Sequence, residues 1–204
     1  MKTISIILLS SCLFISQGIA QEVVLPADSL MRKKAIKMEF FSPLTGNLTL
    51  GYEQYLGNFT SLEFKVGFIG VGKQDFADRR EAGLFISGGP KFKLKPEYAQ
   101  KGTFSTHLLR GGYIRPEVTF ASHKYYRDRE FNPAYGETAT SVALTINYGK
   151  QWVLGDIMTM DWHIGMGYGY TSTDEADYYY RTTWSGGDLP IAWTAGFTIG
   201  VLLK

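Results

Sequence analysis

Charged side chains recur at alternate positions along this chain, and they are the residues whose types and spacing could do chemistry. Cations and anions occur in matched numbers on the polar face of successive segments. In an enclosed interior they could pair with one another, which avoids the cost of burying a lone charge. We expect them to form a structural charge network made of Lys37, Glu39, Glu53, Glu63, Lys65, Lys91, Lys93, Arg115, Glu117, Asp161 and His163.

Two pairs of residues have the types that a catalytic or metal site needs. Asp161 and His163 are two positions apart, so a strand would place both on one face, as a metal pair or an acid–base pair requires. The alternative, which we favour, is that His163 belongs to the interior hydrogen-bond network. Ser122 and His123, followed by Asp128 and Glu130, resemble the groups of an acyl hydrolase. Adjacent strand residues point to opposite faces, which places Ser122 and His123 poorly for a mutual hydrogen bond. We therefore assign no catalytic residue, metal ligand or cofactor.

Two polar segments could contact other molecules. The first is a basic aromatic cluster that could meet the phosphates of lipopolysaccharide: Lys124, Tyr125, Tyr126, Arg127 and Arg129. The second has Asp174, Glu175 and Asp177 before three tyrosines, which suits calcium binding or a protein contact; the tyrosines are Tyr178, Tyr179 and Tyr180. For both segments the alternative is an ordinary solvated loop.

The elements that would position these residues are strands. Apolar residues alternate with polar or small ones, which gives each segment one apolar face. On a helix, the same spacing would scatter the apolar residues around the axis, and the internal glycines would each cost about 1 kcal/mol. Eight such segments occur, over residues 36–40, 48–53, 62–68, 84–94, 113–120, 141–148, 158–168 and 191–201.

Alternation alone does not tell which face is inside, and a soluble lipocalin-like barrel has the same period. Three observations favour an apolar outer face. Four to six large apolar residues per strand would overfill an eight-stranded interior. The charges of the other face are balanced. Aromatic residues lie toward the segment ends, as in the aromatic girdles of membrane barrels; they are Tyr148, Trp162, Tyr168, Tyr170 and Trp193. The sequence predicts an all-β, eight-stranded antiparallel up-and-down transmembrane β-barrel over residues 34–204.

Connection lengths agree with this topology. The stretches 72–82, 123–138 and 171–189 are long and polar, and shorter turns largely alternate with them, which places both termini on the periplasmic side. The stretches 43–47 and 95–106 depart from this alternation. Pro90 and Pro116 lie inside predicted strands and each lacks a ladder donor, so we expect a bulge there.

The N-terminal segment reads as a secretory signal. Lys2 precedes an apolar run over 4–15, and small residues at positions 18 and 20 predict cleavage after Ala20. Residues 21–33 would be a linker. An alternative is acylation at Cys12, which follows a lipobox-like stretch. The formal net charge of +2 gives no reason to expect a nucleic acid partner.

Three stretches carry a family resemblance: Phe41 to Glu53, Gly112 to Glu117 and Gly165 to Tyr170. They resemble strands of an uncharacterised, domain-of-unknown-function outer-membrane β-barrel family common in Bacteroidota. The resemblance implies this fold and compartment and transfers no active site. The chain departs from outer-membrane barrels in general by ending on Leu202, Leu203 and Lys204 instead of an aromatic residue read by the assembly machinery.

The expected function is that of a small non-enzymatic outer-membrane barrel with a filled lumen. It would serve envelope structure or surface interaction through its extracellular loops. Its expected partners are outer-membrane lipid, lipopolysaccharide and, during insertion, the barrel-assembly machinery. The alternatives are a lipid A-modifying enzyme of the outer membrane and a soluble lipocalin-like periplasmic ligand carrier.

Overall fold

The computed structural model describes residues 32–71, 80–94, 107–126, 137–155, 157–172, 179–180, 183–185 and 190–204. The predicted signal peptide, with Cys12 and the cleavage site after Ala20, lies outside these ranges. So do most of the residues predicted for the two loop clusters and the hydrolase-like group, namely Arg127, Asp128, Arg129, Glu130, Asp174, Glu175, Asp177 and Tyr178.

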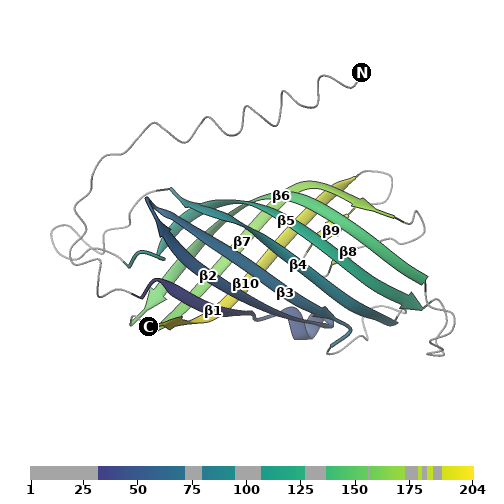
Figure 1. Ribbon diagram of the computed structural model, residues 1–204, viewed down its shortest axis with the longest axis horizontal. Helices are drawn as coiled ribbons and strands as arrows, with labels where there is room; N and C mark the ends of the chain where they lie inside the picture. Colours follow the sequence, from purple (N-terminus) through teal and green to yellow (C-terminus); the bar gives the residue numbers. More distant parts are fainter. Residues whose placement is uncertain are drawn as a thin grey trace, which may run out of the picture.

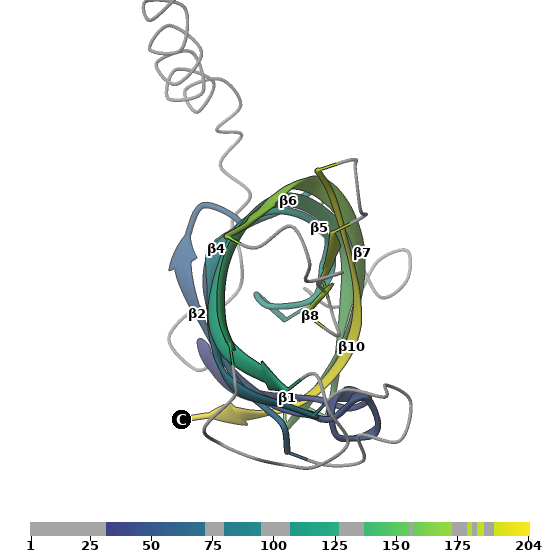
Figure 2. The ribbon, with the colours of Figure 1, turned by 90° about the vertical axis from the view of Figure 1, so that its right-hand side faces the viewer.

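Eight antiparallel strands form a closed barrel (Figures 1 and 2). Each strand pairs with the next along the chain, and pairing of the first with the last closes the ring. The strands are β1 (Lys34–Glu39), β2 (Asn47–Gly57), β3 (Thr60–Ile69), β4 (Arg80–Lys93), β5 (Gly111–Tyr126), β6 (Glu137–Leu154), β7 (Met158–Thr171) and β10 (Ile191–Leu203). The predicted all-β, eight-stranded antiparallel barrel is confirmed.

The two ends of the barrel differ in their connections. The proximal end, where β1 begins and β10 ends, has tight turns between β2 and β3 and between β6 and β7. Asn58 and Phe59 adopt positive φ angles of 46° and 58° to make the first of these turns. The distal end carries the connections after β1, β3, β5 and β7 (Figure 1).

The two strand pairs that β1 makes, with β10 at the closing seam and with β2, are shorter than the other pairs of the barrel wall. β1 has six residues and is followed by a 3₁₀ turn, η2 (Ser42–Thr45). The Ser42 hydroxyl donates to the Glu39 carbonyl at 2.9 Å and accepts from the Thr49 N–H at 3.2 Å, so it bridges the backbones of β1 and β2 where their ladder stops.

Distal to β1, the edge of β10 is covered by a short strand from the preceding connection. Strands β8 (Tyr179–Tyr180) and β9 (Thr183–Ser185) pair with each other, and β9 pairs with residues 192–194 of β10. The stretch 171–189 therefore contains two short strands, and the prediction that it is loop throughout is wrong. Strands of two and three residues are too short for an alternation of apolar and polar residues to be recognised in the sequence.

The bulge expected at Pro90 and Pro116 is also absent. Gly88 pairs with Val118 and Phe92 with Ile114, so the register of β4 and β5 is the same on both sides of the interruption. This register places the two prolines opposite each other, where their missing donors interrupt the ladder at one place without an extra residue. The Asn147 amide donates to the Arg115 carbonyl there at 3.3 Å.

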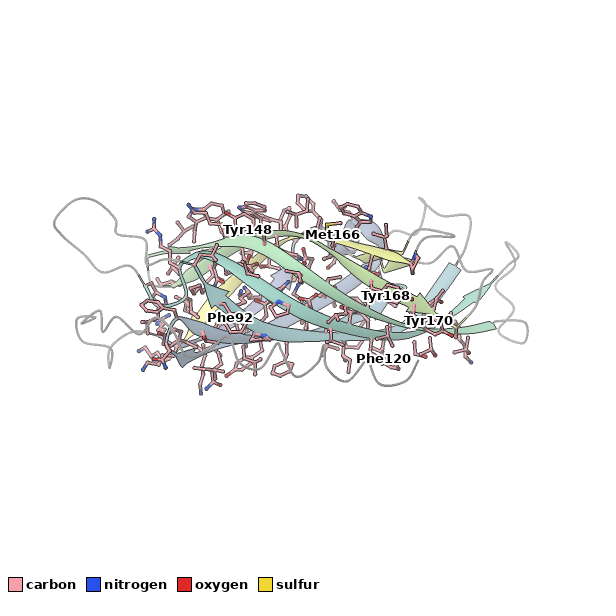
Figure 3. All side chains as sticks on the ribbon, turned by 90° about the horizontal axis from the view of Figure 1, so that it is seen from above. Phe92, Phe120, Tyr148, Met166, Tyr168 and Tyr170 are labelled. Atoms are coloured by element: carbon pink, nitrogen blue, oxygen red, sulfur yellow. The ribbon has the colours of Figure 1, made fainter. Side chains whose placement is uncertain are left out.

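The two faces of the wall have opposite character. Side chains at alternate positions of every long strand point outward and are predominantly apolar (Figure 3). In the described part of the chain, 26 polar or charged residues are buried, compared with 11 hydrophobic ones. The barrel is therefore apolar outside and polar inside, the reverse of a water-soluble protein. Within the same ranges, no helix has the length and apolarity needed to cross a membrane.

Residues 107–110, which precede β5, close the proximal end of the interior. Leu109 is fully buried and packs with Ala35 of β1 and Leu202 of β10. Lys93, the last residue of β4, donates to the Leu109 carbonyl at 2.7 Å. We call residues 107–110 the proximal plug. The stretch 95–106, whose length departs from the predicted alternation, lies outside the described residues.

Candidate functional site

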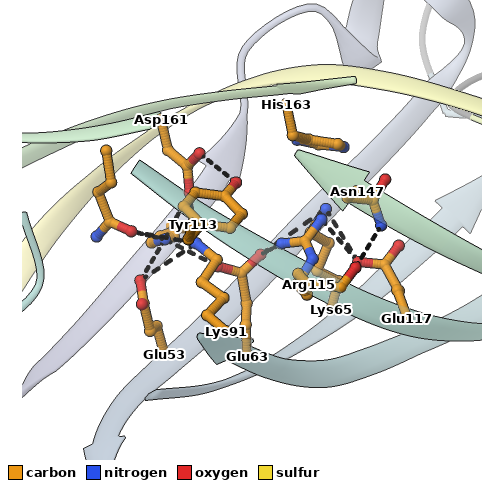
Figure 4. A network of polar contacts seen from close by, with 12 residues as sticks. Glu53, Glu63, Lys65, Lys91, Tyr113, Arg115, Glu117, Asn147, Asp161 and His163 are labelled. Atoms are coloured by element: carbon orange, nitrogen blue, oxygen red, sulfur yellow. Dashed lines mark hydrogen bonds and ion pairs between the residues drawn. The ribbon is translucent and has the colours of Figure 1, made fainter. Parts of the chain in front are cut away.

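A group of ion pairs fills the middle of the barrel (Figure 4). Alternation turns Lys37 of β1 and Lys91 of β4 inward, where they meet carboxylates from three other strands. Lys91 Nζ lies 2.5 Å from both Glu63 Oε2 and Asp161 Oδ2 and 3.6 Å from Glu53 Oε2. Lys37 Nζ pairs with Glu53, with Glu63 at 2.8 Å and with Asp161 at 3.1 Å. Two lysines thus share three carboxylates.

Tyr113 and Gln151 complete this group. The Tyr113 hydroxyl donates to Asp161 Oδ1 at 2.6 Å, and its ring lies 4.2 Å from Lys91 Nζ. Gln151 Oε1 accepts from Lys91 at 3.1 Å and from Lys37 at 3.3 Å. Both side chains are fully buried. We call these seven residues the central cluster: Lys37, Glu53, Glu63, Lys91, Tyr113, Gln151 and Asp161.

A second group adjoins the central cluster. The Arg115 guanidinium contacts Glu63 through Nη1 and Glu117 Oε2 through Nη2, the latter at 2.7 Å. Lys65 lies 3.8 Å from a carboxylate oxygen of both Glu63 and Glu117, beyond hydrogen-bond range. Glu63 therefore links the two groups.

Lys93 joins the network to the proximal plug. Its Nζ bonds the Leu109 carbonyl and lies 3.9 Å from Glu53 Oε1, with Gln151 Oε1 at 3.4 Å. Lys93 thus links the charge network to the backbone of the proximal plug.

The two remaining predicted members lie at the closing seam. Glu39 Oε1 accepts the Phe197 N–H at 2.6 Å, which ties β1 to β10 where their pairing ends. His163 Nε2 is 3.4 Å from the Thr194 hydroxyl. Both lie against Gly196, where a Cβ would collide with the Glu39 carboxylate and the His163 ring. Glycine at this position makes room for the two side chains.

All eleven predicted network residues point inward and are buried, the most accessible being Lys93 at 9%. Asp161 and His163 share a face as expected, but they contact different partners. Asp161 faces Lys37, Lys91 and Tyr113, whereas His163 faces Thr194. Figure 4 shows His163 apart from the dashed contacts. The structure does not bring them together as a metal pair or an acid–base pair.

The residues of the hydrolase-like group are split between the two faces. His123 is buried inside the wall, whereas Ser122 is on the outer side. Lys124 is exposed. Tyr125 and Tyr126 are the last two residues of β5, and Tyr179 and Tyr180 form β8. The side chains of these four tyrosines lie outside the described part of the structure.

The chemistry available to the interior is that of mutual neutralisation. In the described ranges, no group of three His, Cys, Asp or Glu side chains is placed to hold a metal ion. The interstice bounded by Lys37, Glu39, Thr49 and Thr198 has no room for a water molecule. The contacts involve side chains from every strand from β1 through β7. β10 takes part through the Phe197 N–H, which donates to the Glu39 carboxylate. The arrangement cross-links the wall from inside.

Sequence reasoning missed two members of the central cluster. Tyr113 belongs to the predicted segment 113–120 but has no role in the predicted network, and Gln151 lies beyond the predicted end of its segment at residue 148. β6 continues to Leu154 with unchanged alternation. Thr145 and Asn147 point inward, and every second residue of a strand shares a face. Continuing this alternation to residue 151 places Gln151 inside.

Comparison with known proteins gives a family. Residues 6–188 match a family described as a protein of unknown function (DUF3575). No curated protein and no solved structure matches the chain. The match spans most of the chain's length, which confirms the expectation of a family of unknown function. The chain belongs to the DUF3575 family.

Proposed function

We propose that this chain is a small outer-membrane β-barrel that serves as a non-enzymatic envelope or surface protein, acting through the connections at its distal end. The inverted distribution of side chains carries the proposal. Large exposed apolar patches on a soluble monomer mark a contact with lipid or protein. Here all eight strands of the barrel wall carry exposed large hydrophobic side chains, so the apolar face continues around the barrel.

Aromatic residues support a lipid environment. Tyr168 and Tyr170, 60% and 65% exposed, lie toward the distal end of the outer face (Figure 3). Trp152 and Trp162 lie toward the proximal end, with the Lys150 ammonium 5.7 Å from the Trp152 ring. Amphipathic rings of this kind favour the headgroup regions at the two margins of a bilayer.

A filled interior favours a role without a pore. Eight strands leave just enough room for side chains, and the interior is occupied by paired charges. The polar segments at the distal end would then meet partners, with lipopolysaccharide phosphates facing the cluster that begins at Lys124. This orientation makes both termini periplasmic. It fits export by a signal peptide cleaved after Ala20, a linker over 21–33 and insertion by the barrel-assembly machinery, as in the Bacteroidota family that the sequence resembles.

Cell fractionation with cold and boiled gel mobility tests the proposal. A heat-modifiable band in the outer-membrane fraction is expected, because a closed barrel resists detergent until it is heated. A soluble periplasmic band of unchanged mobility would contradict it and favour a ligand carrier. Release or transfer of lipid A acyl chains by the refolded protein would favour the enzyme instead.

The surface role has its own test. Replacing Lys124, Arg127 and Arg129 with glutamine should weaken lipopolysaccharide binding in a pull-down while the heat-modifiable band persists. Replacing Lys150, which lies toward the proximal end, is the matched control and should leave binding unchanged. If wild type, the triple variant and the Lys150 variant bind lipopolysaccharide equally, the result contradicts a role for the distal cluster.

A further inference from the structure

The first strand of the barrel has the shortest ladders of the wall. β1 pairs with β10 over residues 34–39 and with β2 over residues 34–38, whereas β5 pairs with β6 over residues 111–125. Fewer backbone bonds must therefore break to separate β1 from its neighbours than to separate any other strand of the wall. Local opening of a fold begins where its contacts are fewest. The seam between β1 and β10 is the place where we expect the ring to open first.

The proximal plug reaches this seam from the far side of the barrel. Residues 107–110 lead into β5, which lies opposite β1 in the ring (Figure 2). Strands β2, β3 and β4 separate the two on one side, and β10, β7 and β6 on the other. Leu109 nevertheless packs against Ala35 of β1 and Leu202 of β10. The plug thus crosses the lumen and contacts both of the strands that close the ring.

Leu109 meets a facing pair of the seam ladder. Ala35 and Leu202 are register partners, and all three side chains are at most 2% exposed. The Leu202 N–H donates to the Ile157 carbonyl next to β7, so it points away from β1. At this step of an antiparallel ladder the two strands are joined through side chains and not through backbone hydrogen bonds. Leu109 therefore adds packing at a step where the backbones of β1 and β10 do not bond.

The plug is held in place by its own turn and by the charge network. The Leu109 N–H donates to His107 Nδ1 at 3.2 Å, and the Arg110 N–H donates to the His107 carbonyl at 2.9 Å. Lys93 donates to the Leu109 carbonyl at 2.7 Å, and Gln151 Oε1 of the central cluster lies 3.4 Å from the same ammonium. The position of Leu109 is thereby coupled to the charges in the middle of the barrel.

We infer that the proximal plug is a latch on the closing seam. While Leu109 is docked, it holds β1 and β10 together from inside. When the plug leaves, the proximal half of the seam loses this packing and opens. Plug release and seam opening are then a single event, which Lys93 resists through its bond to the plug backbone. The inference goes beyond the proposed function, because it concerns the barrel itself and does not depend on what the distal connections bind.

Hydrogen–deuterium exchange of the refolded full chain in detergent tests the latch. Leu109→Ala should speed exchange in β1 and in residues 198–203 of β10 by about 30-fold or more, the lower end of the effect of truncating a buried leucine. Exchange in the middle of β5 and β6 should stay near the wild-type rate. Ile69→Ala is the matched control, because Ile69 is also buried and faces the lumen but packs at the distal end with Phe85 and Ala121. This control should leave exchange at the seam unchanged.

Two further variants keep the test decisive. Leu109→Val takes the place of the alanine variant if that variant gives no heat-modifiable band, and it should speed the same amides by a smaller factor. Lys93→Met removes the bond to the plug backbone and should also speed exchange at the seam. Uniform acceleration throughout the wall would mean that Leu109 only adds to overall stability. Unchanged exchange at the seam would mean that the plug does not hold it, and either result overturns the latch.

A disulfide across the seam separates the latch from general packing. Ile36→Cys with Val201→Cys joins register partners of the outer face, and the Cα atoms of facing strand residues lie within disulfide range. Cys12→Ser in every variant removes the one native thiol. Once the disulfide is oxidised, Leu109→Ala should no longer speed exchange in β1, because the seam is closed without the plug.

The matched control is a disulfide between two strands that the plug does not hold together. Val118→Cys with Leu144→Cys joins register partners of β5 and β6 that also face outward. In this background Leu109→Ala should speed exchange at the seam as much as it does without a disulfide. If the two disulfides change the effect of Leu109→Ala equally, the plug is no latch on the seam.

Discussion

Replacement of Glu63 by glutamine tests whether the interior of the barrel is as dry as its packing indicates. The Glu63 carboxylate contacts Lys37 at 2.8 Å, Lys91 at 2.5 Å and Arg115, and its side chain is buried. Glutamine keeps the shape of the side chain and removes its charge. Three cations would then lose an anion, and the interstice that Glu63 lines with Lys37 has no room for a water molecule to replace it.

The expected loss in free energy of unfolding is about 3–5 kcal/mol, the usual cost of removing one partner of a buried ion pair. Glu39→Gln is the matched control, since it makes the same chemical change on the same face of the wall. Glu39 takes part in no ion pair within the described ranges, and a glutamine oxygen could still accept the Phe197 N–H. Its expected cost is about 1 kcal/mol, because a neutral acceptor replaces a charged one.

Equilibrium unfolding in denaturant, followed by tryptophan fluorescence in vesicles, measures both values after linear extrapolation to water. The double variant Glu63→Gln with Lys91→Gln should recover part of the loss, since it restores neutrality. The reasoning is refuted if Glu63→Gln costs no more than Glu39→Gln, because water would then be screening the interior charges.

Three further predictions concern other parts of the wall. Phe64→Arg, on the outer face, should cost about 2–4 kcal/mol of folding free energy in vesicles; a variant that folds as well as wild type would mean that this face does not meet lipid. Tyr113→Phe removes the bond to Asp161 and keeps the ring, so denaturant unfolding should show a loss of about 1.5–3 kcal/mol, and no loss would place water at the Asp161 carboxylate. Leu109→Ala should lower stability by about 2–5 kcal/mol in the same assay, and its failure to do so would mean that the proximal plug contributes little packing.

The inward or outward direction of most side chains in the barrel wall could be predicted from the sequence, because a strand has only two faces. Once Phe64 is assigned to the outside, Glu63 and Lys65 must be inside, and the same parity applies along each segment. The charge network could therefore be predicted as a set of residues. Which carboxylate meets which lysine could not, since that depends on the stagger of one strand against the next.

The parts that escaped prediction involve breaks in periodicity. The plug residue Leu109 lies between strands, where no alternation tells which way a side chain points. The ladder interruption at Pro90 and Pro116 keeps its register only because the two prolines face each other, which sequence separation conceals. The 3₁₀ turn after β1 depends on the Ser42 hydroxyl reaching two backbones at once.

The order of charges along the chain has a consequence for assembly. The strands up to β5 contribute five interior cations and four interior anions, listed by strand as Lys37, Glu39, Glu53, Glu63, Lys65, Lys91, Lys93, Arg115 and Glu117. Asp161 supplies the fifth anion from β7, 70 residues after Lys91 and 124 after Lys37.

A barrel built strand by strand from its N-terminus would thus carry surplus positive charge on its inner face until β7 docks. The surplus is one charge, since Lys37 and Lys91 already meet Glu53 and Glu63 in the sheet that ends with β5. The interior charges therefore become balanced only when β7 is added, shortly before β10 closes the barrel. A nascent chain that stalls before β7 would therefore differ from a finished barrel by one interior cation that lacks a matching anion.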